Sequence, residues 1–372
     1  MYIRIHIFIS RSSHNPSLIH IMPVDLTPEN LEEIQAYLRS KGWISATAKV
    51  ASLSSAGEGN MNRTLRAALS SNDGPATLIL KQSVPYVEKY PMIAAPEGRI
   101  DVEAAFYRTV AGSGADAVQA YLPKMLHHDP EERIICLEDL GGAEDMTAAY
   151  AGESAGVFDT KHRSALLGWL EALHGVQVDE ELAGKTFVNR DMRVLNHEHI
   201  FDLPLRPENG VALDGFTIGL QDIAEDYILD EKLRARAGAL GDIYLGKEKK
   251  GDGGRKSVLL HGDFYPGSFL SNSETGVKVI DPEFAFFGPA EFDLGVLVAH
   301  CCFCQTSPAE AERSLSAYGA DFDRELALAF AGLELIRRLL GVAQLPLPSE
   351  TALATKERWL RQGRDWIMAW NP

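Results

Sequence analysis

The segment SVLLHGDFYPGSFLSNSETGVKVIDPE, residues 257–283, carries the most informative pattern in this chain. Its apolar runs Ser257–Leu260 and Val277–Ile280 are typical of short β-strands, and SNSETG between them is typical of a turn. We expect the two strands to form a hairpin that brings HGD (261–263) close to DPE (281–283). Two charged motifs on one hairpin indicate a site for chemistry rather than two unrelated surface loops.

Asp263 follows the first of these strands and can present its carboxylate to a reacting hydroxyl. Phosphoryl transfer needs mainly positioning of the acceptor and neutralisation of phosphate charge, with one carboxylate aimed at the nucleophile. The alternative is that Asp263 only caps a turn, which an isolated His-Gly-Asp would favour. Because a second acidic motif lies on the same predicted hairpin, we predict Asp263 as the catalytic residue, in contact with the substrate.

Asp281 and Glu283 are separated by one residue, so in an extended segment their side chains would project to the same side. Hard oxygen ligands from one or two carboxylates, completed by water and phosphates, are what Mg²⁺ prefers in proteins. We therefore predict both carboxylates as magnesium ligands. A solvated loop is the alternative for a strand that ends in Asp-Pro-Glu.

Lys81 ends the predicted strand Thr77–Lys81, whose other residues are uncharged and expected to be buried, with the ammonium facing a cleft. There it can bind the α- and β-phosphates of ATP as a point charge. Glu103, on the following predicted helix, is the candidate ion-pair partner, and Glu97 is the alternative. Without the two acidic motifs, a surface lysine at a strand edge would be the preferred interpretation.

The loop SAGEGNMN, residues 55–62, joins two predicted strands and contains Gly57, Gly59, Asn60 and Asn62, which all tolerate positive φ. Such a loop can fold its backbone N–H groups over phosphates. It lacks the full GxGxxG pattern, and an ordinary hairpin turn explains it equally well when taken in isolation. Its position before Lys81 favours the phosphate-binding interpretation.

The remaining patterns predict an α+β fold, with a small antiparallel sheet followed by a mainly helical region. Thr27 as N-cap and Pro28 in the first turn predict a helix over Thr27–Lys41. Further strands are expected at Ala48–Leu53, Thr64–Leu69 and Arg133–Leu140, and further helices at Ile100–Val110, Lys161–His174 and Arg324–Leu340. We place an N-terminal lobe at 25–140, covering ATP, and a helical C-terminal lobe with the catalytic and metal-binding loops at 141–372.

The composition is that of a globular protein: 372 residues, 45% hydrophobic and 24% charged, which is enough for about two domains. A formal net charge of -16 leaves no global basic field for nucleic acid or anionic lipid, so an anionic cofactor needs a local basic or metal-lined site. No apolar run reaches the roughly 18 residues that span a bilayer. We expect a cytoplasmic protein.

Four cysteines, at 136, 301, 302 and 304, are too few for a secreted disulfide framework and indicate a reducing compartment. Cys301 and Cys304 form a CxxC beside His300, but a structural zinc site needs a second ligand pair at suitable spacing. We interpret them as small core residues.

Two segments are set apart from the fold. Residues 1–22 contain Arg4 and Arg11 but no acid, so an organelle-targeting signal or an upstream start codon are both open, and residues 1–24 are treated as an extension. GKEKKGDGGRK, residues 246–256, is typical of a mobile surface loop.

Taken together, these motifs resemble the aminoglycoside-phosphotransferase-like superfamily, whose fold is the two-lobed one of protein kinases, and within it the methylthioribose kinases. In that superfamily an asparagine usually stands five residues after the catalytic aspartate; here the position is Ser268, as in the methylthioribose kinase form HGDxxxGS. VKVIDPEFAFFGPAEFDLG (277–295) resembles the metal-binding segment of those kinases, and LILKQSVPYV (78–87) resembles their lysine strand. GEGNMN and LEDL resemble their glycine loop and lobe-connecting hinge.

The resemblance implies roles for further residues. Gly57, Gly59, Asn60 and Lys81 would contact ATP phosphates, Glu138, Asp139 and Leu140 would line the adenine site through backbone groups, and Ser268 would be a candidate magnesium ligand. IRRLLGVAQ resembles the segment whose paired arginines approach the sugar. Adjacent helical residues diverge by about 100°, so Arg337 and Arg338 should not both face the substrate equally, and two surface arginines on an amphipathic helix are the alternative.

The implied reaction transfers phosphate from ATP, with Mg²⁺, to the 1-hydroxyl of 5-methylthioribose, a step of methionine salvage. Tyr265 and Pro266 replace the His and Thr more usual in those kinases, so another hydroxyl acceptor, such as an aminoglycoside, choline, homoserine or a fructosamine, stays open. A catalytically weak ATP-binding pseudokinase is the alternative from another class, raised by Ser268. We expect a small sugar-like substrate, no nucleic-acid or membrane partner, and a homodimer as in many relatives.

Overall fold

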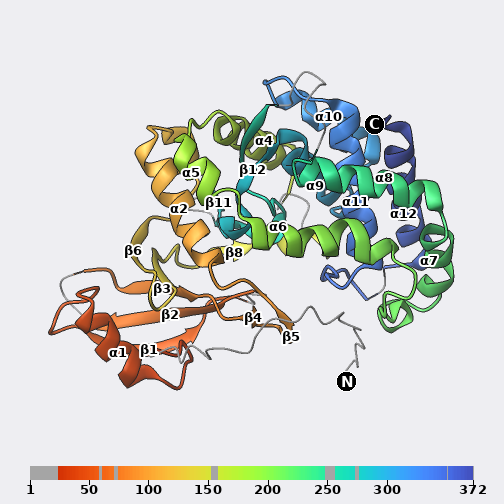
Figure 1. Cartoon of the computed structure of the whole chain (residues 1–372). Coiled ribbons are helices and arrows are strands. Elements are labelled where there is room, and N and C mark those ends of the chain that lie inside the picture. The colour runs from red at the N-terminus through yellow and green to blue at the C-terminus, as the bar shows by residue number, and fades with distance from the viewer. Residues whose placement is uncertain are drawn as a thin grey trace. The chain divides into compact units, whose positions relative to one another are not determined.

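The computed structural model describes residues 24–57, 61–70, 74–151, 158–247, 256–272, 276–349 and 351–371. The predicted extension, apart from its last residue, and most of the loop predicted at 246–256 lie outside these ranges. The chain divides into two compact units (Figure 1). We call them the sheet unit, which runs to Ala143 and includes Lys278–Phe284, and the helical unit, formed by Glu144–Val277 and Ala285–Pro372.

The sheet unit is built on an antiparallel sheet that has five strands within the described residues, in the order β1-β2-β3-β7-β6. The strands are β1 (Lys49–Ser55), β2 (Arg63–Ser70), β3 (Thr77–Gln82), β6 (Met125–Asp129) and β7 (Ile134–Glu138). Four of them confirm the predicted strands. β6 was not predicted, because its sequence MLHHD lacks a clear apolar alternation, and neither was the pair β4 (Tyr86–Val87) and β5 (Tyr90–Ala94).

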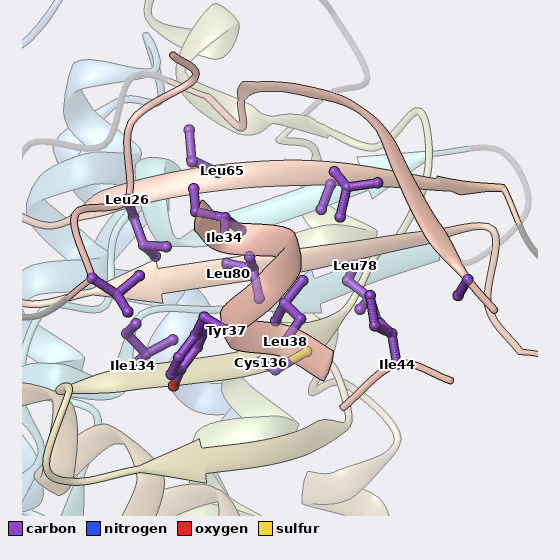
Figure 2. Packing of buried hydrophobic residues seen from close by; sticks show 14 residues of the cluster. Leu26, Ile34, Tyr37, Leu38, Ile44, Leu65, Leu78, Leu80, Ile134 and Cys136 are labelled. Carbon is purple, nitrogen blue, oxygen red and sulfur yellow. The ribbon is translucent and has the colours of Figure 1, made fainter. Parts of the chain in front are cut away.

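Helix α1 (Leu31–Ser40) packs on one face of this sheet (Figure 2). Leu78 and Leu80 of β3 point into that apolar cluster, where they meet Ile34 and Leu38 of α1. Because side chains alternate along a strand, Lys81 belongs to the opposite face of the sheet. The core therefore decides which way the lysine points.

The predicted start of the first helix is wrong. Thr27 and Pro28 lie in a turn, in which the Asn30 N–H donates to the Thr27 carbonyl at 3.1 Å, and the helix begins at Leu31. The turn competes successfully with the first helical turn because Asn30 also donates its side-chain amide to the Asp25 carbonyl at 3.0 Å.

Two further helices complete the sheet unit. Helix α2 (Arg99–Gly112) confirms the helix predicted over Ile100–Val110, and α3 (Asp116–Gln119) is a single turn. α2 carries Glu103, which bonds Lys81 on the face of the sheet opposite α1.

The helical unit confirms the predicted change to long helices. Its helices are α4 (Thr160–His174), α5 (Glu180–Lys185), α6 (Arg190–His197), α7 (Leu220–Ile228), α8 (Glu231–Tyr244), α9 (Ala290–Phe303), α10 (Pro308–Ser314), α11 (Arg324–Leu340) and α12 (Leu353–Ala369). α9 and α12 both pack against α11 (Figure 1). Every residue of α9, and every residue from Ala329 to Leu340 of α11, is buried, so charged residues there sit inside the protein.

The predicted hairpin of Ser257–Leu260 with Val277–Ile280 is wrong. The first run is strand β9, but it pairs antiparallel with β12 (Phe286–Pro289), with Leu260 opposite Phe286. A 3-10 turn at Pro266–Ser268 and strand β10 (Phe269–Asn272) lie between, and β10 pairs with β8 (Glu144–Asp145). β12 escaped prediction because its sequence, FFGP, contains two residues that usually interrupt strands.

The second run is strand β11 (Gly276–Val279), within which the chain passes from the helical unit to Lys278–Phe284. None of the described helices is both long enough and apolar enough to cross a membrane.

Helices α11 and α12 approach each other at two glycines. A Cβ atom added at Gly332 would lie 2.3 Å from the Gly363 carbonyl oxygen, and one added at Gly363 would lie 2.6 Å from that of Gly332. We expect Gly332→Ala to lower the free energy of unfolding by about 1–3 kcal/mol, since backbone cannot move aside as a side chain can. Urea unfolding measures this.

Gly238→Ala is the matched control. Gly238 is an exposed glycine inside α8, with nothing within 4 Å of an added Cβ, so the alanine should stabilise by about 0.5–1 kcal/mol. Equal effects of the two substitutions would contradict the close helix contact.

Candidate functional site

Lys81 lies at the centre of a buried charge cluster in the sheet unit. Its side chain is 5% exposed, and its Nζ atom lies 2.7 Å from Glu103 Oε2 and 2.6 Å from Asp281 Oδ1. The ion-pair partner on α2 is therefore Glu103, whereas Glu97 pairs with Arg133. We expected the ammonium to face a cleft, but carboxylates surround it. The sequence did not predict that Asp281 would be one of them.

The pKa values of this cluster follow from burial and charge. Burial lowers the pKa of Lys81, but Asp281, Glu103 and Glu283 outweigh it and raise that pKa well above its usual range. Burial raises the pKa of Glu103 to about 8, against the opposing effect of Lys81. Lys81 thus stays charged, because the carboxylates around it outweigh the cost of its burial.

Asp281 and Glu283 do not lie on an extended segment, so the reasoning that their side chains share one side is wrong. Asp281 has a left-handed backbone conformation, with φ +62°, and Pro282–Phe284 form a 3-10 turn. The two carboxylates have different environments as a result: the Asp281 side chain is 44% exposed, and that of Glu283 is 5% exposed.

Glu283 is held by Arg99 and Asn62. Glu283 Oε2 accepts a hydrogen bond from Asn62 Nδ2 at 2.8 Å and lies 3.3 Å from Arg99 Nε. Arg99, whose side chain is fully buried, also donates to the carbonyls of Met61 at 2.7 Å and Val84 at 2.8 Å. It therefore ties the end of the glycine-containing loop to the acidic motif. Sequence reasoning missed Arg99, because an arginine at the start of a helix is usually a surface residue.

A divalent cation fits Asp281 better than Glu283. The Asp281 carboxylate is accessible, while Glu283 is already bonded to a guanidinium and an amide. The cluster holds three carboxyl groups and two cations, and Glu103 Oε1 is buried without a hydrogen-bond partner within the described residues. Those residues contain no group of three or more side chains suited to a metal ion, so phosphates and water would have to supply most ligands.

The other residues predicted to bind ATP lie in different local environments, and two of them lie outside the described residues. Gly57 has φ +83° in the turn after β1, but Gly59 and Asn60 lie outside the described residues. The Asp139 carboxylate is held by Arg66 through two bonds, at 2.7 and 3.0 Å, so its side chain has a structural partner. Glu138 ends β7 and Leu140 is half-buried beyond it.

Asp263 is the centre of a second site, in the helical unit. The Asp293 carboxylate accepts the backbone N–H groups of His261 at 2.7 Å and Gly262 at 3.0 Å, and Gly262 has φ +86°. These contacts fix the turn that presents Asp263, whose side chain is 24% exposed. Ser268 donates its hydroxyl to the Asp263 carbonyl at 2.9 Å and is itself buried, so its hydroxyl stabilises this same turn.

Arg337 and Arg338 both reach Asp263, although adjacent residues of a helix point about 100° apart. Their Nη2 atoms lie 3.6 and 3.3 Å from Asp263 Oδ1. Both are buried, so they are not surface arginines. Their Nε atoms bond the same carboxylate, that of Glu334, which sequence reasoning missed. Its spacing, three and four residues before the arginines in an apolar helix, was the available indication.

Burial raises the pKa of Asp263, and Arg338 and Arg337 oppose that rise. The carboxylate is therefore only partly exposed to water and lies next to two cations. Of the two cysteines of the CxxC, Cys301 is buried on α9, which confirms its interpretation as a core residue, whereas Cys304 is only half-buried.

The comparison with known families decides the assignment that the geometry leaves open. A model of a phosphotransferase enzyme family matches residues 71–329. The chain belongs to this family. The resemblance drawn from the sequence motifs is thereby confirmed.

Curated relatives of this phosphotransferase cover nearly its full length. A methylthioribose kinase from Bacillus cereus (strain G9842) is 27% identical, covering 91% of this chain and 92% of its own. One from Geobacillus thermodenitrificans (strain NG80-2) is 28% identical, covering 84% of this chain and 85% of its own. These identities are moderate, so the names of the relatives enter below as support for a proposal.

Solved structures confirm the predicted fold class. The phosphotransferase is similar to an ethanolamine kinase from Plasmodium vivax, with a TM-score of 0.53, 13% identity and coverage of 94% of this chain and 90% of that one. It is also similar to LicA in complex with AMP, with a TM-score of 0.51, 14% identity and coverage of 90% and 98%. At these identities the likeness concerns the kinase-like fold alone.

Removing Lys81 tests the buried charge cluster. We expect Lys81→Met to lower the free energy of unfolding by about 3–5 kcal/mol, because it leaves buried carboxylates without their cation. The double variant Lys81→Met/Glu103→Leu should lose less than Lys81→Met alone. Chemical denaturation of the two variants and the wild type measures this coupling.

Lys185→Met is the matched control, since Lys185 pairs with Glu181 on the surface, with both side chains more than 70% exposed. It should change stability little. A loss as small for Lys81→Met as for this control would show that the cluster is not coupled.

Proposed function

We propose that this phosphotransferase transfers the γ-phosphate of ATP to a hydroxyl of a neutral, sugar-like molecule, with the 1-hydroxyl of 5-methylthioribose as the preferred acceptor. The observation that carries the proposal is the contact of Asp263 with two buried arginines. The substrate choice is supported by the curated relatives, which are methylthioribose kinases along about nine-tenths of the chain. The reaction would be a step of methionine salvage.

Asp263 is the proposed catalytic residue. Its carboxylate would accept a hydrogen bond from the acceptor hydroxyl and orient the oxygen for attack. Because burial raises the pKa of Asp263, against the opposing effect of Arg338 and Arg337, this carboxylate accepts a proton more readily than a surface aspartate. Arg337 and Arg338 would bind the acceptor or the transferred phosphate.

Nucleotide binding is assigned to the region 25–140. Lys81 would hold the ATP phosphates, with Glu103 fixing its ammonium. Gly57, Gly59 and Asn60 would supply backbone and amide donors, and Glu138, Asp139 and Leu140 would contact adenine through backbone groups. The acceptor is assigned to the region 141–372, and the homodimer remains a prediction.

Magnesium is the proposed cofactor, with Asp281 as its principal protein ligand. When bound, it would neutralise phosphate charge during transfer. Glu283, bonded to Arg99 and Asn62, would shape the site and contribute a ligand only if those bonds rearrange. Ser268 remains a candidate whose hydroxyl already has a partner.

The charges around Asp263 favour a neutral acceptor. Asp263 and Glu334 supply two negative charges, and Arg337 and Arg338 supply two positive ones, so the group is balanced. No net negative charge is therefore left to attract a cationic acceptor such as choline or an aminoglycoside, and such an acceptor would lie next to two guanidiniums. Homoserine and a fructosamine are weaker alternatives, and a pseudokinase would bind MgATP without turnover.

The acceptor is identified by ADP release with MgATP and 5-methylthioribose, ribose, choline, homoserine or kanamycin. We expect turnover with 5-methylthioribose and at least about tenfold lower kcat/KM with the cationic acceptors. Strong phosphorylation of kanamycin would overturn the substrate choice. ATP binding without turnover of any acceptor would favour the regulatory alternative.

Asp263→Asn tests the chemistry itself. We expect kcat to fall by about 100-fold to 10,000-fold, with the dissociation constant for MgATP nearly unchanged, because the amide cannot accept the hydroxyl proton. Single-turnover kinetics and calorimetric titration of the nucleotide measure the two effects. Near-normal turnover would remove Asp263 from the mechanism.

A further inference from the structure

Glu334 lies beneath both arginines of the acceptor site. On helix α11 it precedes them by three and four residues, the spacings at which helical side chains meet. Each of its two oxygens accepts a hydrogen bond from one arginine: Oε2 from Arg337 Nε, and Oε1 from Arg338 Nε at 2.8 Å. Glu334 is 1% exposed, so water does not compete for these bonds.

This shared carboxylate explains why two divergent side chains converge. Adjacent residues on a helix point about 100° apart, and yet both guanidiniums lie within 3.6 Å of the same Asp263 oxygen. Each arginine is held through Nε, the inner edge of its guanidinium, and reaches Asp263 with Nη2. The arginines are thus fixed at one end and directed at the other.

Glu334 is held in turn by a buried histidine and tyrosine. His300 Nε2 lies 3.0 Å from Glu334 Oε1, and the Tyr150 hydroxyl lies 2.7 Å from His300 Nδ1. Both rings are fully buried. In the sequence His300 stands next to the CxxC of Cys301 and Cys304, and the proposed function gives it no role.

The protonation states fix the direction of these bonds. Burial lowers the pKa of His300 to about 4, although Glu334 opposes this, so the ring is neutral at neutral pH. Burial alone would raise the pKa of Glu334, but Arg337 and Arg338 hold it well below its usual range. His300 therefore donates from Nε2 to the Glu334 carboxylate, and its Nδ1 accepts from the Tyr150 hydroxyl.

Tyr265 restricts Arg338 from another side. The Arg338 guanidinium carbon lies 4.8 Å above the centre of the Tyr265 ring, and the same ring packs against His300 with centroids 5.3 Å apart. A guanidinium stacked on an aromatic face has its plane restricted as well as its position. The histidine, the tyrosine ring and Glu334 together leave Arg338 little freedom.

We propose that Glu334, braced by His300 and Tyr150, is a positioning residue that sets Arg337 and Arg338 on Asp263 and on the acceptor. The inference rests on the proposed role of Asp263 in phosphoryl transfer. Stability alone does not call for this arrangement, because well-packed apolar residues of similar volume often replace buried ion pairs without loss. What the ionic group supplies is the geometry of two donors at one carboxylate.

Glu334→Gln is the first variant, since it keeps the size and removes the charge. A glutamine has one acceptor oxygen in place of two and turns its NH₂ toward a guanidinium or toward the His300 donor. We expect the KM for the acceptor to rise about 10- to 100-fold and the KM for ATP to stay within about twofold. The acceptor is whichever compound the wild type phosphorylates.

A purely structural defect gives a different kinetic pattern. It lowers the concentration of active enzyme, so apparent kcat falls while both KM values are kept. That pattern, or an unchanged acceptor KM in a folded Glu334→Gln variant, would overturn the positioning role.

Arginine Nε–H hydrogen exchange provides a readout that needs no turnover. In ¹⁵N-arginine-labelled protein, the Nε–H groups of Arg337 and Arg338 should exchange slowly, and Glu334→Gln should accelerate both at least about tenfold. Unchanged exchange would count against the proposal. If the wild type turned over no acceptor, the proposed function would fail, while this measurement would still decide whether Glu334 holds the arginines.

Tyr150→Phe keeps the test decisive if Glu334→Gln does not fold, because it removes a single hydroxyl at the far end of the brace. We expect a rise of about 2- to 10-fold in acceptor KM. Tyr37→Phe is the matched control: it deletes another buried tyrosine hydroxyl, bonded to Asp129 at 2.9 Å in the sheet unit. Equal effects of the two variants on acceptor KM would contradict the brace.

Discussion

The cost of burying charge is the constraint on which both halves of this molecule depend. An ionised group inside a protein must be paired and hydrogen-bonded, or it gives up its charge. Lys81 meets this condition through carboxylates from α2 and from the Asp281 turn, and Arg337 and Arg338 meet it through Glu334 and Asp263. In each case the partner that satisfies the charge also sets its direction, so electrostatic balance and site geometry have the same origin.

Several of these charged partners are positioned by regular secondary structure. Strand alternation turns Leu78 and Leu80 toward α1 and leaves Lys81 on the other face, where α2 supplies Glu103. Helical spacing places Glu334 under two consecutive arginines. The exceptions are the backbone turns at Gly262 and Asp281, where positive φ values present a carboxylate that a strand or helix would direct elsewhere.

Sequence patterns predicted what depends on local periodicity and missed what depends on long-range pairing. Apolar spacing predicted the first and last residues of α11 and the presence of the strand that carries Lys81. The sequence motifs predicted the kinase-like fold. The partner of β9 was not predicted, because FFGP carries no strand pattern until Phe286 packs on Tyr244 and Phe292. Arg99 and Glu334 were missed for a related reason. The burial of a charged side chain can be predicted only when the partners that pair with its charge are known.

The glycine contact between α11 and α12 bears on how the proposed acceptor site could change in other members of the family. At Gly332 and Gly363 the backbones of the two helices lie so close that neither position has room for a methyl group. A shift of α11 toward α12, to make room for a bulkier molecule beside the arginines, would therefore press backbone against backbone. Under the proposed function, we therefore expect new acceptor preferences to arise by substitution of the side chains around Arg337 and Arg338, and not by movement of the helix that carries them.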